Sequence, residues 1–269
     1  MRKTIGSASI LLMILLLQSV SAQPEWDWTY KDQCIVFSMA FNHKGDLAVG
    51  FGYDAILLKP SGTRVFKVPT RDFAYSIAVS DNDYTVVGTR GFFIQLFDPS
   101  GKLVYEYKTG NQVWAVDISR DGRIFVAGSQ DGWIYYFRDR KLLWKKDTGA
   151  PIWGVQLYNG TIVTGNNGGM ITVFDASGRI LWSKNLGGRV WRIKAADDRI
   201  AALTVRGESS ITSTLYMFTL NGTGLWHREF SDYVRDMDFD GKRVVVGGDI
   251  GEIDTFDVNG SEIYSVPNF

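Results

Sequence analysis

The chain has 269 residues, in which 29 lysine and arginine residues balance 29 aspartate and glutamate residues. This neutral balance gives no electrostatic basis for binding nucleic acid, which requires a basic surface. Hydrophobic residues make up 45% of the chain, so a large packed core is expected, and because Cys34 is the only cysteine an intrachain disulfide is excluded.

Residues 1–22 differ in composition from everything that follows. A positively charged start precedes the unbroken apolar run ILLMILLL at residues 10–17, and the small residues VSA follow at 20–22. The run is shorter than the roughly 20 residues that span a bilayer, so it is typical of a cleaved secretory signal rather than of an uncleaved membrane anchor. We therefore expect an extracytoplasmic mature protein of residues 23–269, without a transmembrane span.

A unit of four short strands recurs along the mature chain. Its clearest copy is residues 113–149, where VWAVDI, RIFVAG, WIYYF and KLLWKK are rich in β-branched and aromatic residues. Turns that contain Asp-Gly favour tight hairpins between these segments. A repeated four-stranded antiparallel meander is typical of β-propeller blades.

Large side chains mark the register of the repeat. An aromatic residue in each fourth strand is followed nine residues later by the residue that begins the next first strand, which we call its anchor. The fourth-strand residues are Trp28, Phe66, Tyr105, Trp144, Trp182, Trp226 and Tyr264, and the anchors are Phe37, Tyr75, Trp114, Trp153, Trp191 and Arg235. This constant step predicts a constant crossing from each blade to the next.

The repeat count predicts an all-β fold, a single closed β-propeller of six four-stranded antiparallel blades over residues 23–269. Closure is expected because an open array would leave apolar blade faces and a sheet edge in water. The surplus strand around Trp28 is predicted to clasp the last blade. Five second strands end in glycine, which suits close backbone approach: Gly50, Gly88, Gly128, Gly165 and Gly247.

Several segments resemble known propeller repeats. FDASGRILWSKNLGGRVW at residues 174–191 resembles the quinoprotein-type repeat, and SRDGRIFVAGSQDGWIYYF at residues 119–137 resembles the tryptophan-aspartate type. Such families include quinone-dependent dehydrogenases, the propeller lipoprotein of bacterial outer-membrane assembly and secreted binding proteins. The resemblance implies a propeller fold and leaves the function open. Its enzymatic members hold their quinone with a disulfide of adjacent cysteines, which this chain lacks, so no cofactor is expected.

Polar residues alternate with apolar ones along the first strands, which line the channel of a propeller. The channel candidates are Asp117, Gln156, Arg192, Lys194, Asp236 and Asp238. They could form a site for a polar ligand or cation, or they could neutralise one another as ion pairs between neighbouring blades, which is the interpretation we favour. The aromatic anchors are expected to pack between blades rather than to form a stacking platform. Arg235 is the one anchor that is not aromatic. Its side chain could extend to a blade edge, or it could mark the functional side of the ring.

The fifth unit lacks its glycine and has six extra residues within positions 205–214, predicted to form a long polar loop. Long loops in compact domains are often functional. The predicted partner-loop residues are Arg206, Gly207, Glu208, Ser209 and Ser210. Three Asn-Gly-Thr/Ser segments match glycosylation acceptors but also suit hairpin turns: they begin at Asn159, Asn221 and Asn259.

No catalytic constellation is evident, since His43 and His227 are distant in the repeat and no nucleophile elbow or phosphate-binding loop is present. We predict a monomeric, non-catalytic binding or scaffolding propeller for a protein or glycan partner, centred on units five and six. The alternative is a metal-dependent hydrolase or lactonase in the channel, with Asp117, Asp236 and Asp238 as hard oxygen ligands.

Overall fold

A computed structural model describes residues 35–207, 211–249 and 251–266. The predicted signal peptide, Cys34 and the predicted clasp strand around Trp28 lie outside these ranges. The described part consists of six four-stranded antiparallel sheets, with no helix, and each sheet takes its strands in sequence order. The predicted all-β class and the six blades of four strands are therefore confirmed.

The first three sheets come from the N-terminal half. Sheet 1 contains β1 (Val36–Phe41), β2 (Leu47–Phe51), β3 (Asp54–Leu58) and β4 (Arg64–Pro69). Sheet 2 contains β5 (Ala74–Val79), β6 (Thr85–Thr89), β7 (Phe93–Phe97) and β8 (Leu103–Lys108). Sheet 3 contains β9 (Val113–Ile118), β10 (Ile124–Ser129), β11 (Trp133–Arg138) and β12 (Lys141–Asp147).

The remaining three sheets follow in the same order. Sheet 4 contains β13 (Ile152–Tyr158), β14 (Thr161–Asn166), β15 (Met170–Asp175) and β16 (Ile180–Asn185). Sheet 5 contains β17 (Arg189–Ala196), β18 (Arg199–Arg206), β19 (Thr212–Thr219) and β20 (Gly224–Phe230). Sheet 6 contains β21 (Val234–Phe239), β22 (Arg243–Gly248), β23 (Ile253–Asp257) and β24 (Glu262–Val266).

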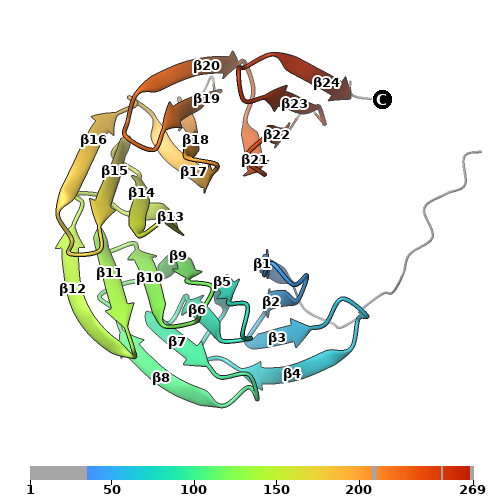
Figure 1. Cartoon of the computed structure of the whole chain (residues 1–269), viewed down its shortest axis with the longest axis vertical. Coiled ribbons are helices and arrows are strands. Elements are labelled where there is room, and N and C mark those ends of the chain that lie inside the picture. Colours follow the sequence, from blue (N-terminus) through green and yellow to red (C-terminus); the bar gives the residue numbers. More distant parts are fainter. Residues whose placement is uncertain (1–34, 208–210, 250, 267–269) are drawn as a thin grey trace, which may run out of the picture. The chain divides into compact units, whose positions relative to one another are not determined.

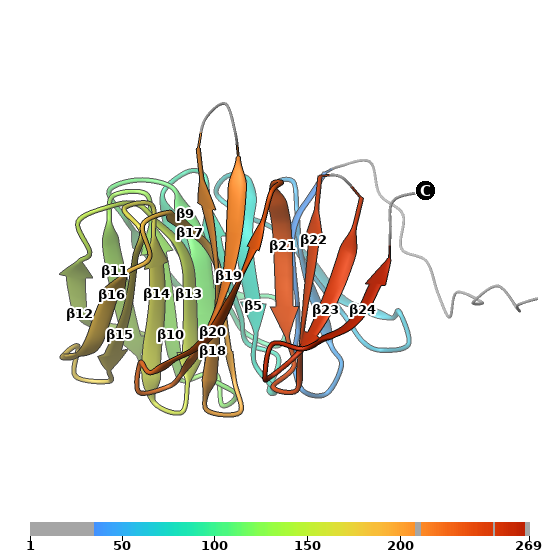
Figure 2. The same cartoon turned by 90° about the horizontal axis from the view of Figure 1, so that it is seen from above.

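The sheets follow one another around an arc, with every first strand on the inner side and every fourth strand on the outer side (Figure 1). A meander of this kind has two ends, which Figure 2 shows from the side. We call the end with the second-to-third connections and the links to the next sheet the front rim. The end with the first-to-second and third-to-fourth turns is the back rim. The long β18–β19 hairpin projects from the front rim (Figure 2).

Five apolar clusters form the core, one at each boundary between successive sheets. At the boundary between sheets 2 and 3, for example, Ile94 and Leu96 pack with Val116 and Phe125, and all four are almost fully buried. Burying such side chains contributes about 1.5–3 kcal/mol each. The fold is therefore stabilised mainly by contacts between sheets.

The glycines that end the second strands permit this close packing. A Cβ added at Gly88 would lie 2.5 Å from Cγ1 of Val113, the residue that begins the first strand of the next sheet, and 2.9 Å from its carbonyl oxygen. Gly128 and Gly165 would meet Ile152 and Val190 in the same way. A Cβ added at Gly50 would lie 2.7 Å from the Ala74 carbonyl oxygen, so the prediction of close backbone approach is confirmed for the boundaries that follow sheets 1 to 4.

The fourth-strand tryptophans explain the constant nine-residue step. The indole Nε1 of Trp144, Trp182 and Trp226 donates a hydrogen bond to a carbonyl in the third-to-fourth turn of the following sheet, at 3.0, 2.8 and 2.8 Å. In the same turns the ring lies against a glycine, such as Gly222 on Trp182. At the boundaries after sheets 3, 4 and 5 this contact holds each outer strand against the third-to-fourth turn of the next sheet.

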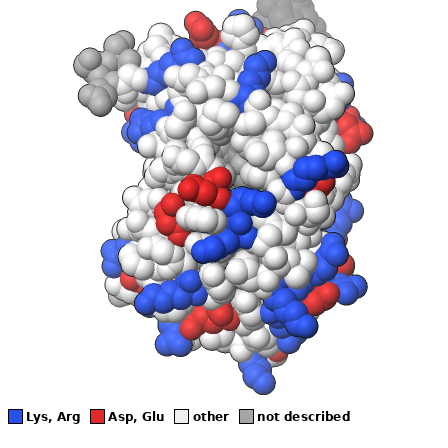
Figure 3. All heavy atoms as spheres, turned by 90° about the vertical axis from the view of Figure 1, so that its left-hand side faces the viewer, with Lys and Arg blue, Asp and Glu red and all other residues white. Residues whose placement is uncertain are grey.

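Each outer strand carries a β-bulge beside its aromatic residue. The bulged residues are Val65, Val104, Leu143, Leu181, Leu225 and Ile263. All of these except Val104 are exposed. Bulges and lysine side chains both disfavour pairing of a free sheet edge with another chain. On the side that bears β12 and β16, basic and acidic side chains are interspersed (Figure 3).

The predicted closure of the ring is not confirmed. Among the described residues no apolar cluster joins sheet 6 to sheet 1. Met39 and Phe41 of β1 are 65% and 69% exposed, whereas the equivalent Met237 and Phe239 of β21 are 4% and 6% exposed against sheet 5. Closure depends on contacts between the two ends of the repeat array, which no local periodicity specifies.

Candidate functional site

The first strands bring the six anchors to the front end of the inner wall. In every first strand the pairing with the second strand skips one residue, and that residue is the anchor. A bulge changes the direction of the side chain of its extra residue. The anchors therefore do not belong to the regular alternation of inward-facing and sheet-facing side chains along the first strands. The residue before each anchor, such as Val113, faces the neighbouring sheet.

Successive anchors contact one another around the arc. The Trp114 and Trp153 rings stack with centroids 3.9 Å apart, and the Trp153 and Trp191 centroids are 4.6 Å apart. All three are half-buried. They pack across sheet boundaries, as expected, and Trp153 lies between the other two rings. Stacking of a ligand on these faces is thus unfavourable.

Two of the predicted channel residues join sheets by hydrogen bonds to backbone. Asp117 Oδ2 accepts a hydrogen bond from the Leu157 amide of the next sheet at 2.7 Å. Gln156, at the equivalent position one sheet later, accepts one from the Ala195 amide at 2.6 Å. Burial raises the pKa of the Asp117 carboxyl to about 6, although the backbone hydrogen bonds oppose this shift. The hydrogen bonds of both side chains therefore link one sheet to the next.

The charged channel candidates form two ion pairs between sheets 5 and 6. Arg192 Nε lies 2.8 Å from Asp236 Oδ1, and Lys194 Nζ lies 3.0 Å from Asp238 Oδ1. The two aspartate side chains are 72% and 78% exposed, so each pair contributes only about 0–1 kcal/mol. The geometry matches the interpretation in which these charges neutralise one another.

Arg235 is also paired. Its guanidinium forms an ion pair with Asp249 and lies 4.1 Å from the centroid of the Tyr233 ring. The hydrogen bonds from the guanidinium lower the pKa of the Asp249 carboxyl. Arg235 thus continues the row of anchors as a cation stacked on an aromatic ring, at the front rim of sheet 6.

The insertion in the fifth unit is organised differently from the predicted long loop. It extends the β18–β19 ladder, in which Val205 pairs with Ser213 and Arg206 pairs with Thr212. Arg206 Nη2 donates to the Leu186 carbonyl at 2.5 Å, so this predicted partner residue is held against the front rim. Gly207 has φ +87°. The predicted residues Glu208, Ser209 and Ser210 lie outside the described residues. Added strand pairs, rather than an irregular loop, account for most of the extra length.

The front rim of sheets 1 and 2 carries an aromatic patch that the sequence analysis missed. The patch is defined as Tyr53, Phe73 and Arg90, in which Phe73 contacts the other two, together with Phe92 from the same β6–β7 connection as Arg90. The Tyr53 and Phe73 centroids are 4.2 Å apart, and the Arg90 guanidinium lies 4.4 Å above the Phe73 ring. Tyr53 and Phe92 are 52% and 36% exposed. The repeat positions of these residues carry other residue types in most sheets, as glycine does at the position of Phe92, so no periodic signal could have revealed them.

Phe92 also has an unusual backbone conformation. Its φ is +74°, in the left-handed region that side chains with a Cβ rarely adopt. In sheets 3 and 4 the equivalent residue before the third strand is a glycine, Gly132 with φ +87° and Gly169 with φ +86°. Sheet 2 therefore keeps an exposed phenylalanine where the turn itself favours glycine.

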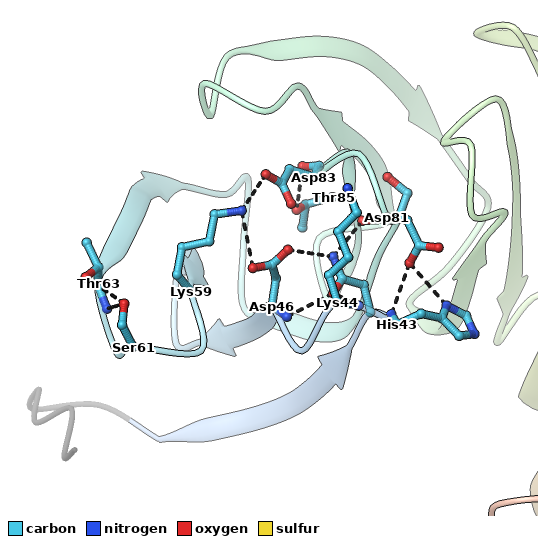
Figure 4. A network of polar contacts seen from close by, with 11 residues as sticks. His43, Lys44, Asp46, Lys59, Ser61, Thr63, Asp81, Asp83 and Thr85 are labelled. Atoms are coloured by element: carbon cyan, nitrogen blue, oxygen red, sulfur yellow. Dashed lines mark hydrogen bonds and ion pairs between the residues drawn. The ribbon is translucent and has the colours of Figure 1, made fainter. Parts of the chain in front are cut away.

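The back rim carries a polar network between sheets 1 and 2 (Figure 4). Lys59 Nζ lies 3.2 Å from Asp46 Oδ1 and 2.8 Å from Asp83 Oδ2. Burial raises the pKa of Asp46, but hydrogen bonds from Asn42 and Lys59 outweigh it and the pKa is lowered overall. The cation is held between two carboxylates from different sheets, so this network stabilises the boundary.

The structure does not assemble the carboxylates of the alternative hydrolase site. Asp117 of sheet 3 accepts a hydrogen bond from the Leu157 amide of sheet 4, whereas Asp236 and Asp238 face basic partners of sheet 5. Within the ranges that the structure describes, no group of three or more His, Cys, Asp or Glu side chains is placed to hold a metal ion. The same ranges contain no helix long and apolar enough to cross a membrane.

Comparison with known proteins identifies the repeat. The family model described as outer membrane protein assembly factor BamB matches residues 55–264. No curated protein sequence matches the chain. Three similar solved structures are a computationally designed protein, Ika8, a chain of the mitotic checkpoint complex, and BamB from Moraxella catarrhalis.

These structures share the fold at low sequence identity. Ika8 has a TM-score of 0.74 and 18% identity, covering 86% of this chain and 74% of that chain. The checkpoint-complex chain has a TM-score of 0.74 and 15% identity, covering 89% and 82%. BamB from Moraxella catarrhalis has a TM-score of 0.68 and 16% identity, covering 89% and 79%. Because the family model spans most of the chain, this protein belongs to the family of the outer membrane protein assembly factor BamB.

Proposed function

We propose that this chain is a monomeric, extracytoplasmic and non-catalytic β-propeller that binds a protein partner through the front rim of sheets 1 and 2. The assignment to the BamB family supports a scaffolding role, and the apolar run at residues 10–17 supports export. The site differs from the one expected on units five and six, where Arg206 donates to the Leu186 carbonyl of its own chain.

The observation that carries this proposal is the backbone of Phe92. A residue other than glycine in the left-handed region costs about 1–3 kcal/mol, and strain of this kind is concentrated at functional sites. The side chain is still 36% exposed, so burial offsets this strain only in part. A role outside the fold is the simplest reason for phenylalanine at this position.

The composition of the patch fits a protein contact. Tyrosine and arginine dominate the residues whose truncation weakens protein interfaces, and phenylalanine is enriched in interface cores. Arg90 forms an ion pair with Asp72 through Nη2 at 3.3 Å, which holds the guanidinium over Phe73. A guanidinium held in place in this way loses little side-chain entropy when it contacts a partner.

The test is the substitution Phe92→Gly. It removes the side chain and the backbone strain together, so the unfolding free energy should be unchanged or higher, while partner affinity should fall at least about tenfold, as for a central interface residue. The partner is first isolated by affinity capture from the native extracytoplasmic fraction, and its affinity is then measured with purified proteins. Leu225→Ala, an exposed change on an outer strand, is the control. Unchanged affinity of Phe92→Gly, or a clear loss of stability, would refute this site.

We further propose that the ring closes by contact of sheet 6 with sheet 1. Met39 and Phe41 have the apolar character of their buried equivalents in other sheets. Gly247 is equivalent to Gly88, which lies against the first residue of the next sheet. A Cβ added at Gly247 would nevertheless meet no atom within 4 Å. Both features are needed only if a neighbouring sheet packs there.

A further inference from the structure

The three Asn-Gly-Thr/Ser segments all lie on the back rim. Asn159 is in the first-to-second turn of sheet 4, and Asn221 and Asn259 are in the third-to-fourth turns of sheets 5 and 6. All three are exposed. In a four-stranded meander these two kinds of turn lie at the same end of the sheets. The acceptor segments of three consecutive sheets thus face away from the rim that carries the aromatic patch.

The turns themselves do not require asparagine. In sheets 2 and 4 the equivalent residue is a serine, whose hydroxyl donates to the aspartate two residues earlier: Ser100 to Asp98 at 2.6 Å and Ser177 to Asp175 at 2.5 Å. In sheets 5 and 6 asparagine replaces this serine, and a hydroxyl residue follows two positions later, where sheet 2 has Lys102. Sheet 1 shares the hydroxyl residue at the later position, Thr63, but has Ser61 rather than asparagine, so the acceptor pattern is confined to sheets 5 and 6 among these turns.

Asn221 is oriented for modification. Its Oδ1 accepts hydrogen bonds from the Thr219 hydroxyl and from the Thr223 amide and hydroxyl, the latter at 3.2 Å. Among the described residues no acceptor lies on its amide nitrogen. Asn159 differs, because its Nδ2 donates to Asp198 Oδ1 at 3.2 Å, a bond that modification would break.

A hollow of about 400 Å³ adjoins Asn221. It is lined by Asp197, Asp198, Arg199, Thr219, Leu220, Asn221 and Leu225. Its carboxylates and guanidinium can accept and donate hydrogen bonds to hydroxyl and amide groups, and Leu225 offers an apolar surface. Its volume lies within the range of small-molecule sites.

We propose that Asn221 carries an N-linked saccharide whose first sugar lies in this hollow. The amide nitrogen attacks the anomeric carbon of a lipid-linked saccharide pyrophosphate supplied by the cell. A C–N bond forms, the bond from that carbon to the phosphate oxygen breaks, the lipid pyrophosphate leaves, and a base of the cell's transferase takes the amide proton. A saccharide here leaves the front rim free, so the modification is independent of the proposed partner site.

The experiment produces the full chain, with its own leader, in a cell that glycosylates exported proteins. Peptide mass analysis before and after peptide N-glycosidase should show a saccharide on Asn221, with conversion of this residue to aspartate by the enzyme. Asn221→Ser and Thr223→Lys introduce residues that the equivalent turn of sheet 2 accommodates, so both variants should fold and lack the saccharide. An unmodified Asn221 in the wild-type chain would overturn the proposal.

A second measurement tests whether the first sugar lies in the hollow. Amide hydrogen exchange at residues 197–199 should become faster when the saccharide is removed enzymatically, and should remain unchanged when only the saccharide on Asn259 is absent in Asn259→Ser. Equal exchange with and without the Asn221 saccharide would overturn the placement of the sugar in the hollow.

Discussion

Substitution of Gly247 by alanine tests ring closure by its effect on stability. Gly88→Ala provides the scale, because the added methyl group would lie 2.5 Å from Val113 Cγ1 and 2.9 Å from its carbonyl oxygen. Overpacking of this kind costs about 1–3 kcal/mol. Replacing glycine within a strand returns about 0.5–1 kcal/mol of backbone entropy. The net loss expected for Gly88→Ala is about 0–2.5 kcal/mol.

In a closed ring Gly247→Ala should also lose stability, since Val36 would occupy the place that Val113 has beside Gly88. The loss should be smaller than for Gly88→Ala, whose methyl group would also meet Ser76 Oγ of its own sheet at still closer range. In an arc with free ends nothing opposes the new methyl group, and the variant should gain about 0.5–1 kcal/mol. Urea unfolding of both variants, monitored by tryptophan fluorescence, separates the two outcomes because they differ in sign. A neutral or stabilised Gly247→Ala beside a destabilised Gly88→Ala would refute closure.

Three further predictions concern contacts between sheets. Because the pKa of Asp117 is raised, the folded state binds the proton of this carboxyl more tightly than the unfolded state does. The contribution of Asp117 to stability is therefore greatest below about pH 4 and is lost as pH rises through about 6. This loss is about 1–3 kcal/mol, and urea unfolding of Asp117→Asn from pH 4 to 7 should not show it. A double-mutant cycle of Lys194→Ala and Asp238→Ala should give a coupling of about 0.2–1 kcal/mol that decreases with salt, because both side chains are substantially exposed; a coupling above about 2 kcal/mol would contradict this exposure. Ser213→Ala should lower the free energy of unfolding by about 1–3 kcal/mol, because the buried hydroxyl donates to the Asp232 carbonyl and accepts from the Val234 amide of sheet 6. Thermal unfolding measures this loss, and Thr212→Ala, a change at an exposed neighbour, should leave the same measurement unchanged.

The repeat architecture could be predicted from the sequence because each of its signals reflects a contact made at successive sheet boundaries. The nine-residue step corresponds to the tryptophan that donates to the next turn, as Trp182 does to Leu220. The glycines correspond to the close approach of the next first strand, as at Gly88. A physical requirement that recurs at each boundary leaves a period in the sequence.

Features that occur once, or that alter the period locally, could not be predicted in this way. The bulge at each anchor interrupts the alternation of β-strands, so the direction of Trp153 could not be counted from its position. The extra residues of the fifth unit lengthen a ladder, as the pairing of Arg206 with Thr212 shows, although their polar composition suggested a loop. The left-handed backbone of Phe92 depends on turn geometry that its side chain disfavours.

The measurement that tests the proposed function most directly is site-specific photo-crosslinking in the native extracytoplasmic compartment. A photoreactive amino acid replaces Tyr53 or Phe92 on the front rim, Lys242 on the back rim, or Leu225 on an outer strand, one position at a time; all four residues are exposed. The account predicts one discrete protein adduct from each front-rim position and none from the other two. The same adduct from Lys242 or Leu225, without adducts from Tyr53 and Phe92, would contradict it.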